Sequence, residues 1–401
     1  MAGRFFRNRK LRALSAAALA ALAFGATQRR GRAFVRQRAR SIPVLRRLRA
    51  WTRELRDPPW SAADVGNGRA ATDIVLLDPM GIARNSSGTV YITDRGRGTR
   101  GRFVWRVEPD GTAHVIAGTG RRGGSPAGVP ALESSLGSPE GVAVDEGGLV
   151  YVVDSANHVV LRIEHDGGMT RIAGTGERGF GGDGGPATDA SLAMPYDLRF
   201  DSRGNLYIAD FGNHRIRRVT PDGMIETAAG TGEAGYSGDG APATAARLNG
   251  PYGAFVDAAD RLLIADSFNH VIRRVDEDGV ITTIAGAGAA GYAGDGGPAL
   301  QALFDTPQSL AVDGDGRIYV GDEHNHAIRV VGTDGVISAF IGNGLPGFAA
   351  EGVTANQAQL NDPENLLLLG DGSMLITDGD NGRVLRVKPD GAVQPFAGGA
   401  A

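Results

Sequence analysis

The chain has 401 residues, including 62 glycines and 19 prolines, and it contains no cysteine. The lack of cysteine excludes disulfides, thiolate metal sites and a cysteine nucleophile. The net charge of −3 conceals an asymmetry, because residues 1–57 hold 16 Lys and Arg against two acidic residues, leaving 26 basic and 43 acidic residues in the remainder. Since an acidic body repels phosphate backbones, we expect no nucleic acid to bind the remainder.

The N-terminal residues combine positive charge with a short apolar run. Five basic residues precede the run at 13–26, which is short for a membrane span and suits the hydrophobic region of an export signal. Nine arginines follow within residues 29–49, and positive charge on both sides of such a run opposes translocation. We expect residues 1–27 to be a signal peptide or membrane anchor and the protein to be extracytoplasmic; the alternative is a basic segment that is not exported, in a cytoplasmic protein.

Residues 28–63 form an arginine-rich segment and linker. Within it, residues 41–56 are predicted to be an amphipathic helix, with Ser41 as its cap and Pro43 in its first turn. Apolar side chains occupy one face and arginines the other. One interpretation is contact with anionic lipid head groups at a membrane. The other is packing against the underside of the following domain.

A single pattern recurs six times after residue 78. Each copy opens with a proline, its second apolar run closes with an aspartate, and copies follow one another at 56 residues after a first step of 60. The prolines are Pro79, Pro139, Pro195, Pro251, Pro307 and Pro363, and the aspartates are Asp94, Asp154, Asp210, Asp266, Asp322 and Asp378. Six copies at a fixed period indicate a repeat architecture.

Each copy contains four short apolar runs separated by turn residues, which is typical of strands joined by hairpins. In the third copy the runs are residues 196–201, 206–210, 215–220 and 224–229. Several runs are apolar on both faces, so both faces of each sheet must be covered. We therefore predict an all-β fold, a six-bladed β-propeller of four-stranded antiparallel blades over residues 64–401. Residues 71–77 are a candidate edge strand that closes the ring.

The repeated motif P-x-G-[VI]-A-V-D…G-x-[LI]-Y-[VI]-x-D-x-x-N-H-x-[IV]-R resembles NHL repeats of the bacterial type, over residues 79–400. The resemblance implies a six-bladed propeller. It implies no single activity, because NHL-type proteins include binding modules, lyases and lactonase-like relatives, and fold does not fix function.

The residue after each opening proline is expected at the mouth of the central channel. These residues are Met80, Glu140, Tyr196, Tyr252, Gln308 and Glu364, with Asn365 beside the last. Lactonase-like propellers hold a divalent metal at such a mouth, so Glu140, Glu364 and Asn365 are the candidate ligands by resemblance. Oxygen ligands favour Ca²⁺ or Mg²⁺. NHL-type peptide-amidating lyases bind zinc there through His, and none of the six is His, which counts against that chemistry.

The long links between blades carry regularly placed aromatic and acidic residues, which we expect on the same face as the D-x-x-N-H turns. They are Phe180, Tyr236, Tyr292 and Phe348, and Asp183, Asp239 and Asp295. The rings either plug the gaps between blades or form a ligand or calcium surface. Conserved spacing within the chain gives the Asp and Asn of each turn a structural role, since their side chains can bind backbone N–H groups.

Arginines that repeat in the third run of most copies are expected to form ion pairs between blades. They are Arg106, Arg162, Arg218, Arg274 and Arg386. The first copy has a basic insertion at 95–102, either solvated or anion-binding, and Glu323-His324 is an acid–base candidate found in one copy alone.

Together these features favour a non-catalytic binding or scaffold propeller that presents the loops of one face to a protein or glycan ligand. No triad or strong metal cluster is apparent in the regular repeats. The alternative is a metal-dependent hydrolase or lyase with its site at the channel mouth, where the glutamates lie. A bound cofactor, if there is one, would be Ca²⁺ or another divalent cation.

Overall fold

The computed structural model describes residues 60–98, 100–124, 128–348 and 352–399. The chain divides into two units, Met1–Pro58 and Pro59–Ala401, and the described residues belong to the second. The predicted export signal and amphipathic helix lie outside them. Among the described residues, no helix has the length and apolar character that a membrane crossing requires.

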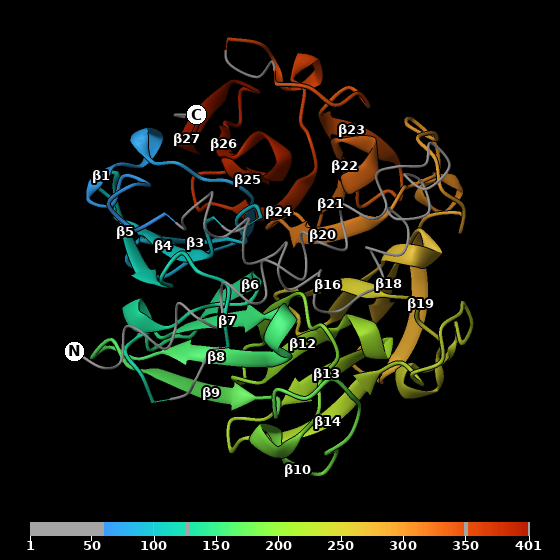
Figure 1. Ribbon diagram of the computed structural model, residues 1–401. Coiled ribbons are helices and arrows are strands. Elements are labelled where there is room, and N and C mark those ends of the chain that lie inside the picture. Colours follow the sequence, from blue (N-terminus) through green and yellow to red (C-terminus); the bar gives the residue numbers. More distant parts are fainter. Residues whose placement is uncertain (1–59, 99, 125–127, 349–351, 400–401) are drawn as a thin grey trace, which may run out of the picture. The chain divides into compact units, whose positions relative to one another are not determined.

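The second unit is a ring of six antiparallel sheets around a central axis, which confirms the predicted six-bladed propeller (Figure 1). The strands of blades 1 to 3 are β1 (Arg69–Ala70), β2 (Pro79–Arg84), β3 (Val90–Asp94), β4 (Phe103–Val107) and β5 (Thr112–Ala117); β6 (Pro139–Val144), β7 (Val150–Asp154), β8 (Val159–Ile163) and β9 (Met169–Ala173); and β10 (Gly185–Pro186), β11 (Leu198–Phe200), β12 (Leu206–Asp210), β13 (Arg215–Val219) and β14 (Met224–Ala229).

Blades 4 to 6 repeat the same order. Their strands are β15 (Ala241–Pro242), β16 (Pro251–Val256), β17 (Leu262–Asp266), β18 (Val271–Val275) and β19 (Val280–Ala285); β20 (Pro307–Val312), β21 (Ile318–Asp322), β22 (Ala327–Val331) and β23 (Ile337–Ile341); and β24 (Pro363–Leu368), β25 (Met374–Asp378), β26 (Arg383–Val387) and β27 (Val393–Gly398). The strand that opens with the repeated proline lies innermost, and β2 contacts both β6 and β24, so the inner strands form a closed circle.

Short 3₁₀ turns occur at two places in the repeat. One set follows the second strand of blades 2 to 6: η3 (Ser155–Asn157), η5 (Phe211–Asn213), η7 (Ser267–Asn269), η9 (Glu323–Asn325) and η11 (Gly379–Asn381). The other lies in the links: η1 (Ala71–Asp73), η2 (Ala131–Glu133), η4 (Ala187–Asp189), η6 (Ala243–Ala245), η8 (Ala299–Gln301) and η10 (Ala355–Gln357). These turns and the strands are the regular elements of the described residues.

Apolar clusters fill the space between neighbouring blades. In blade 4, all five residues of β17 are buried, and Leu263 and Ala265 pack toward blade 5 while Ile264 packs toward blade 3. This explains why the strands are apolar on both faces, since each sheet is covered by a neighbour on either side. The inner strands approach closely: a Cβ added to Gly81 would lie 2.6 Å from the Glu140 carbonyl oxygen, so glycine follows the mouth residue there.

Each link belongs structurally to the blade that follows it. The Ala187 N–H donates to the Gly223 carbonyl of blade 3, while the Ala187 carbonyl accepts from Gly174 at the end of blade 2. The segment before blade 1 repeats this arrangement, because its sequence Ala71-Thr72-Asp73 matches Ala187-Thr188-Asp189. It is therefore the link that closes the ring.

The candidate edge strand at residues 71–77 does not form. Only Arg69 and Ala70 pair as a strand, on β5, and residues 71–73 form the turn η1 against β27. Ile74 and Leu76 then pack with Leu375, Val384 and Ala397 of blade 6 and with blade 1. Apolar packing, rather than a shared strand, closes the ring.

The aspartate that closes each second strand anchors the turn after it, as predicted. In blade 3, Asp210 Oδ1 accepts the Ala193 N–H at 2.7 Å, and Asn213 donates to Asp210 Oδ2 and to the Gly179 carbonyl of the link, both at 2.7 Å. The histidine that follows has left-handed backbone, and His214 Nδ1 accepts the Gly250 N–H of the next blade at 3.0 Å. These residues fix the position of one blade against the next, which gives the repeated histidines a structural role.

Candidate functional site

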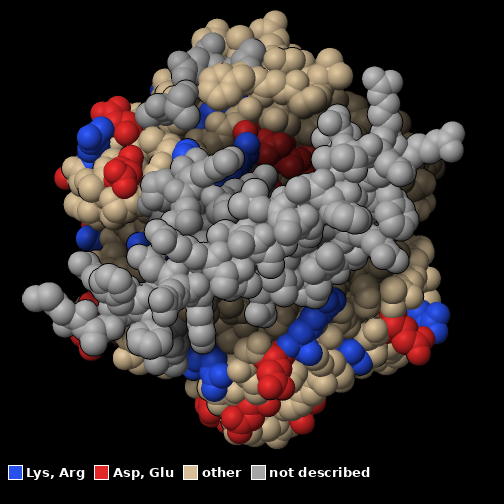
Figure 2. Space-filling model, viewed as in Figure 1, with Lys and Arg blue, Asp and Glu red and all other residues tan. Residues whose placement is uncertain are grey.

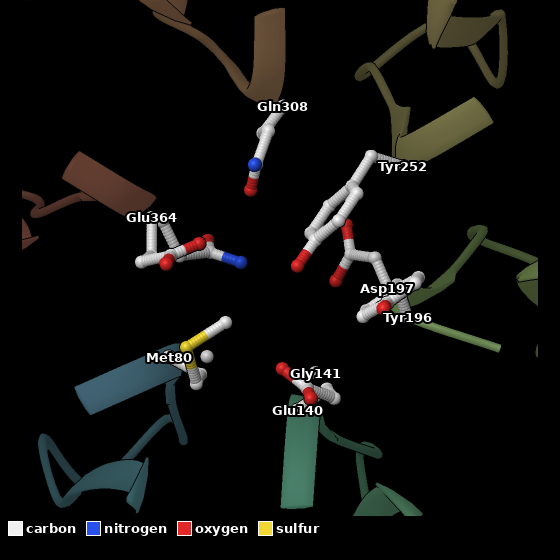
Figure 3. A pocket seen from close by; sticks show the side chains of 10 residues that line it. Met80, Glu140, Gly141, Tyr196, Asp197, Tyr252, Gln308 and Glu364 are labelled. Atoms are coloured by element: carbon white, nitrogen blue, oxygen red, sulfur yellow. The ribbon is translucent and has the colours of Figure 1, made fainter. Parts of the chain in front are cut away.

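The six residues after the opening prolines surround one small space on the axis (Figure 3). We call this space the channel mouth, and its lining is Met80, Gly81, Glu140, Gly141, Tyr196, Asp197, Tyr252, Gln308, Glu364 and Asn365. In five blades the residue belongs to the innermost strand, while Tyr196 lies just before β11. The space between the side chains has a volume of about 10 Å³, which is about the room that one water molecule needs.

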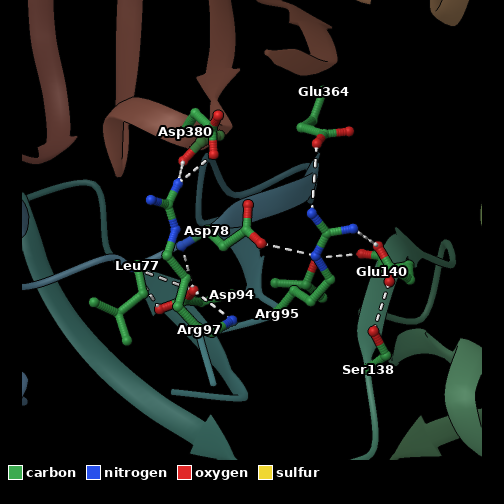
Figure 4. Close-up of polar contacts among 12 residues, drawn as sticks. Leu77, Asp78, Asp94, Arg95, Arg97, Ser138, Glu140, Glu364 and Asp380 are labelled. Carbon is green, nitrogen blue, oxygen red and sulfur yellow. Dashed lines mark hydrogen bonds and ion pairs between the residues drawn. The ribbon is translucent and has the colours of Figure 1, made fainter. Parts of the chain in front are cut away.

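Arg95 supplies a positive charge at the channel mouth (Figure 4). Its Nε lies 2.8 Å from Asp78 Oδ2, its Nη1 3.9 Å from Glu140 Oε2, and its Nη2 3.8 Å from Glu364 Oε1. Sequence reasoning placed Arg95 in a basic insertion at the surface, and that interpretation was wrong for this residue. The signal that identifies it is its position directly after Asp94, where blade 5 has Glu323.

The carboxylates at the mouth are buried, and burial raises their pKa. The pKa of Glu140 is raised to about 7 although Arg95 is nearby and the Ser138 hydroxyl donates to Glu140 Oε1 at 2.7 Å. Burial, followed by repulsion from Glu323, raises the pKa of Glu364 well above its usual range. Burial and then repulsion from Asp362 raise the pKa of Glu323 to about 7. A desolvated carboxylate favours a proton or a metal cation.

Blades 3 and 4 contribute an aromatic wall to the same mouth. The rings of Tyr196 and Tyr252 stack with centroids 4.1 Å apart, and Phe211 contacts both edge-on. Phe268 extends the cluster at 5.5 Å from Phe211. Burial raises the pKa of Tyr196 to about 12, so its hydroxyl is neutral at physiological pH. The mouth is therefore aromatic on one side and carboxylate-rich on the other.

A polar contact joins blades 3 and 6 at the mouth. Arg199 of blade 3 donates to Asn365 Oδ1 of blade 6 at 3.0 Å, and the same oxygen accepts the Leu366 N–H at 2.9 Å. The amide oxygen of Asn365 already has two donors. A metal held by Glu140, Glu364 and Asn365 together would compete with Arg95 and Arg199, and that ligand set stays a prediction.

Glu364 of the mouth also meets two further carboxylates at its edge. Oxygens of Glu323, Asp362 and Glu364 all lie within 4.8 Å of one another. Oε2 of Glu323 and of Glu364 are buried without a hydrogen-bond partner among the described residues. Oxygen-only donors with unpartnered atoms suit a hard divalent cation such as Ca²⁺ or Mg²⁺. Glu323 thus lies beside the mouth, which the repeated positions alone did not predict.

His324 lies beside this cluster, at the surface. Its Nε2 is 3.7 Å from Glu323 Oε2, and its Nδ1 is 3.1 Å from the Thr306 hydroxyl. The acid–base role considered for Glu323 and His324 stays a prediction. In the visible part of this face, acidic side chains lie in a recess with basic side chains beside them (Figure 2).

The aromatic residues of the links cover buried arginines. The ring centroids of Phe180, Tyr236 and Tyr292 lie 5.0, 5.2 and 5.0 Å from the Cζ atoms of Arg217, Arg273 and Arg329. Phe348 lies over the buried Arg383, at 4.0 Å. The four rings thus cover arginines in four blades, yet these aromatic residues remain 37–56% exposed.

The acidic residues of the same links form ion pairs with these arginines. Asp239 lies 2.6 Å from Arg273 and Asp295 lies 2.7 Å from Arg329, and Asp183 pairs with Arg217 in the equivalent position. Each guanidinium is fully buried and also approaches the aspartate that closes the second strand. Sequence reasoning missed these arginines, which are the strongest polar anchors of the loop face.

The arginines singled out from the sequence face the other way. Arg106, Arg162 and Arg274 pair with Glu108, Glu164 and Asp276, within their own blades. The remaining two do the same, in the pairs Arg218–Glu226 and Arg386–Asp371. The expected pairing between blades was wrong, because successive residues of a strand point to opposite faces and the inward-facing arginine is one residue earlier.

Family signatures match two parts of the ring. One described as "NHL repeat" matches residues 136–162 and 192–219, and one described as "Teneurin NHL domain" matches residues 288–400. Among curated proteins, Teneurin-m of Drosophila melanogaster is 28% identical over 354 residues, which is 79% of this chain and 12% of that protein. Protein SUPPRESSOR OF QUENCHING 1, chloroplastic, of Arabidopsis thaliana is 27% identical over 55% of this chain and 22% of that protein. The chain thus spans between about a tenth and a fifth of such relatives.

Solved structures share the architecture at low sequence identity. A protein of unknown function from Bacteroides thetaiotaomicron superposes with a TM-score of 0.59 at 18% identity, covering 83% of this chain and 74% of that one. An auxiliary nutrient binding protein from the same organism gives 0.57 at 12% identity, over 80% and 70%. The gluconolactonase XC5397 of Xanthomonas campestris gives 0.51 at 16%, over 80% and 89%. These likenesses show the fold alone. The chain thus carries NHL-type repeats at the matched residues, arranged in a closed ring of six blades.

Proposed function

We propose that the propeller is a non-catalytic binding module that presents its loop face to a protein or glycan ligand. The loop face comprises the links and the D-x-x-N-H turns, which contact one another through bonds such as Asn213 to the Gly179 carbonyl. The observation that carries the proposal is the difference between the small space at the channel mouth and the exposed aromatic residues of the loop face. The channel mouth has room for one water, whereas the loop face exposes four aromatic rings in equivalent positions.

The rings are held in place before any ligand arrives. Tyr236 lies over Arg273, and its hydroxyl is 2.8 Å from the Thr283 hydroxyl. Arg273 in turn is fixed by Asp239 and by the Ser237 carbonyl. Aromatic side chains with restricted rotamers lose little conformational entropy on binding, and they are enriched among the residues that dominate interfaces.

The chemistry beside the rings limits the partner. Asp183, Asp239 and Asp295 each keep more than a third of the side chain exposed next to a ring. Ring faces with carboxylates at their edges suit basic or polar peptide segments and sugars, whose hydroxyls donate to carboxylates while their C–H faces stack on aromatic rings. They disfavour nucleic acid, because the carboxylates repel phosphate.

A second candidate function is a metal-dependent hydrolase or lyase acting at the channel mouth. The observation in its favour is the set of buried, unpartnered carboxylate oxygens on Glu140, Glu323 and Glu364. It ranks second because the space at the mouth, about 10 Å³, is too small for a substrate, and because Arg95 already lies near Glu140 and Glu364.

Binding assays on the full chain separate the two functions. A glycan array and a photo-crosslinking residue placed at Tyr236 or Tyr292 should capture ligand, while the same crosslinker at Arg203, an exposed residue in the hairpin between β11 and β12, should not. Tyr236→Ser combined with Tyr292→Ser should weaken binding at least tenfold. Hydrolysis of lactones or aryl esters in the presence of Ca²⁺, Mn²⁺ or Zn²⁺, abolished by Glu364→Gln, would instead support the enzyme and contradict the proposal.

We also propose that the basic N-terminal residues direct the protein to a membrane or through it. The support is the 16 Lys and Arg among residues 1–57 together with the apolar run within them. Fractionation of cells that express the full chain, against a variant lacking residues 1–57, tests this. Equal distribution of the two proteins would contradict it.

A further inference from the structure

At the boundary between consecutive blades, three positions of the repeat can be compared from one blade to the next. They are the residue after the aspartate that closes one blade's second strand, and the residues before and after the proline that opens the next blade. We call each set a seam. Seam 5–6 consists of Glu323, Asp362 and Glu364, and seam 1–2 consists of Arg95, Ser138 and Glu140.

Seam 5–6 brings three carboxylates into one small volume. Their oxygens lie within 4.8 Å of one another, and the residues are buried at Glu323 and Glu364 and half-buried at Asp362. The backbone of Asp362 is fixed, because its N–H donates to His326 Nδ1 at 3.3 Å and its carbonyl accepts the Gly379 N–H at 3.0 Å. The backbone that carries Asp362 is therefore held in place against blade 5 through His326.

The described residues bring too little positive charge to seam 5–6 to balance its three carboxylates. Arg95 reaches Glu364 only at 3.8 Å and is held closer by Asp78 at 2.8 Å. His324 lies 3.7 Å from Glu323 with half of its side chain exposed. Buried like charges at this range are costly unless a cation or protons compensate them.

Gln308 provides an independent sign of a missing partner. Gln308 is buried, with 4% exposed, and its side chain points into the mouth from β20 of blade 5 (Figure 3). The Gln308 side chain hydrogen-bonds Glu323, while Gln308 Oε1 has no partner among the described residues. Oε2 of Glu323 and of Glu364 are unpartnered as well. Among the described residues, Gln308 and two residues of seam 5–6 thus each have a buried acceptor atom without a donor.

We infer that seam 5–6 binds a hard divalent cation, Ca²⁺ in preference to others, through the carboxylates of Glu323, Asp362 and Glu364 and the amide oxygen of Gln308. All four donors are oxygens, which excludes a preference for the softer ions that seek thiolate or imidazole. Calcium tolerates irregular oxygen sites completed by water, whereas Mg²⁺ demands near-ideal octahedral geometry. The bound ion joins blade 6 to blade 5. The inference stands apart from the proposed binding function of the loop face.

Calcium titration of the full chain after dialysis against EDTA tests the site, by calorimetry and by thermal unfolding at pH 7.5. We expect CaCl₂ at millimolar concentration to raise the melting temperature by several degrees, and Glu364→Gln and Glu323→Gln each to weaken Ca²⁺ binding at least tenfold. Asp380→Asn is the matched control, because it removes a carboxylate of the same blade that is half exposed and paired with Arg97. This control should bind Ca²⁺ as the wild type does.

Three results would overturn the inference. One is the absence of both heat and melting shift in the wild type. Another is a shift that survives in Glu364→Gln, or in Asp362→Asn should the first variant fail to fold. The third is loss of Ca²⁺ binding in Glu140→Gln while Glu323→Gln still binds, because that pattern would place the ion on the other side of the mouth.

Discussion

Seam 1–2 and seam 5–6 each place three side chains at the same positions of the repeat, and they differ in how the charge of the buried carboxylates is balanced. In seam 1–2, one carboxylate, Glu140, is accompanied by a cation, Arg95, and by a donor, Ser138, and only its Oε2 lacks a hydrogen-bond partner. In seam 5–6, the corresponding residues are all acidic, and two carboxylate oxygens remain without a partner. The comparison teaches that the repeated positions build the ring, while the chemistry lies in the positions that differ between blades.

The two seams share one anchor of the backbone and differ in another. Asp154 accepts the Gly137 N–H and Asp378 accepts the Asn361 N–H, each two residues before the opening proline. Before the third strand, His326 of blade 5 accepts the Asp362 N–H at 3.3 Å, whereas blade 1 has Arg102, which donates to the Gly137 carbonyl at 3.1 Å. Changing an anchor should therefore disturb the whole ring, whereas changing a seam residue should alter charge alone.

The largest effect is expected from removing a buried arginine anchor. Arg273→Met leaves the buried Asp266 and the link residue Asp239 without their cation, so we expect a loss of about 3–5 kcal/mol in the free energy of unfolding. The neighbouring Arg274→Met, whose pair with Asp276 is partly exposed, should cost at most about 1 kcal/mol. Urea unfolding measures both. Equal losses would contradict the distinction between the two arginines.

Removing the cation of seam 1–2 should come next. Arg95→Gln leaves Asp78, Glu140 and Glu364 without a shared counter-charge. Because the Arg95 side chain is about one-third exposed, we expect a loss of roughly 2–4 kcal/mol, somewhat below the cost for a fully buried pair. Arg97→Gln breaks an exposed pair with Asp380 and should change stability by less than about 1 kcal/mol. An Arg95→Gln variant with an unchanged free energy of unfolding would show that seam 1–2 does not depend on the charge of Arg95.

The pH dependence of stability sharpens the comparison through Glu140. Its pKa in the folded protein is raised to about 7 from an ordinary value of 4.5, so protonation favours the folded state. The stability from this group is complete below its unfolded pKa and is lost as pH rises through 7. Glu140→Gln mimics the protonated form, so it should match the wild type near pH 5 and exceed it by up to roughly 3 kcal/mol at pH 8. A difference that does not vary with pH would contradict this.

The ring could be predicted from the sequence because every blade contains the same pattern of residues. The period, the turn residues and the apolar runs recur in every blade, and the position after each opening proline follows from symmetry. The structure places Met80, Glu140, Tyr196, Tyr252, Gln308 and Glu364 around one space, and what they bind stays a prediction.

Other features escaped because they depend on contacts between repeats. Arg95 lies in an insertion that breaks the period, and a basic insertion suggests a solvated surface. Arg273 and Arg274 are adjacent in sequence, and only the pairing of the strand shows which one points inward. The acidic cluster combines Glu323 of one copy with Asp362 and Glu364 of the next, so inspection of single copies does not reveal it.

The most direct test gives seam 5–6 the arginine that seam 1–2 has at the same position. Glu323→Arg places a guanidinium beside Asp362 and Glu364, at the position that Arg95 occupies in seam 1–2, and Glu323→Gln is its control. We predict that thermal unfolding in EDTA shows Glu323→Arg melting above both the wild type and Glu323→Gln, with no further rise on adding Ca²⁺. A Glu323→Arg protein that melts below the wild type in EDTA, or that still responds to Ca²⁺, would contradict the claim that seam 5–6 lacks a cation.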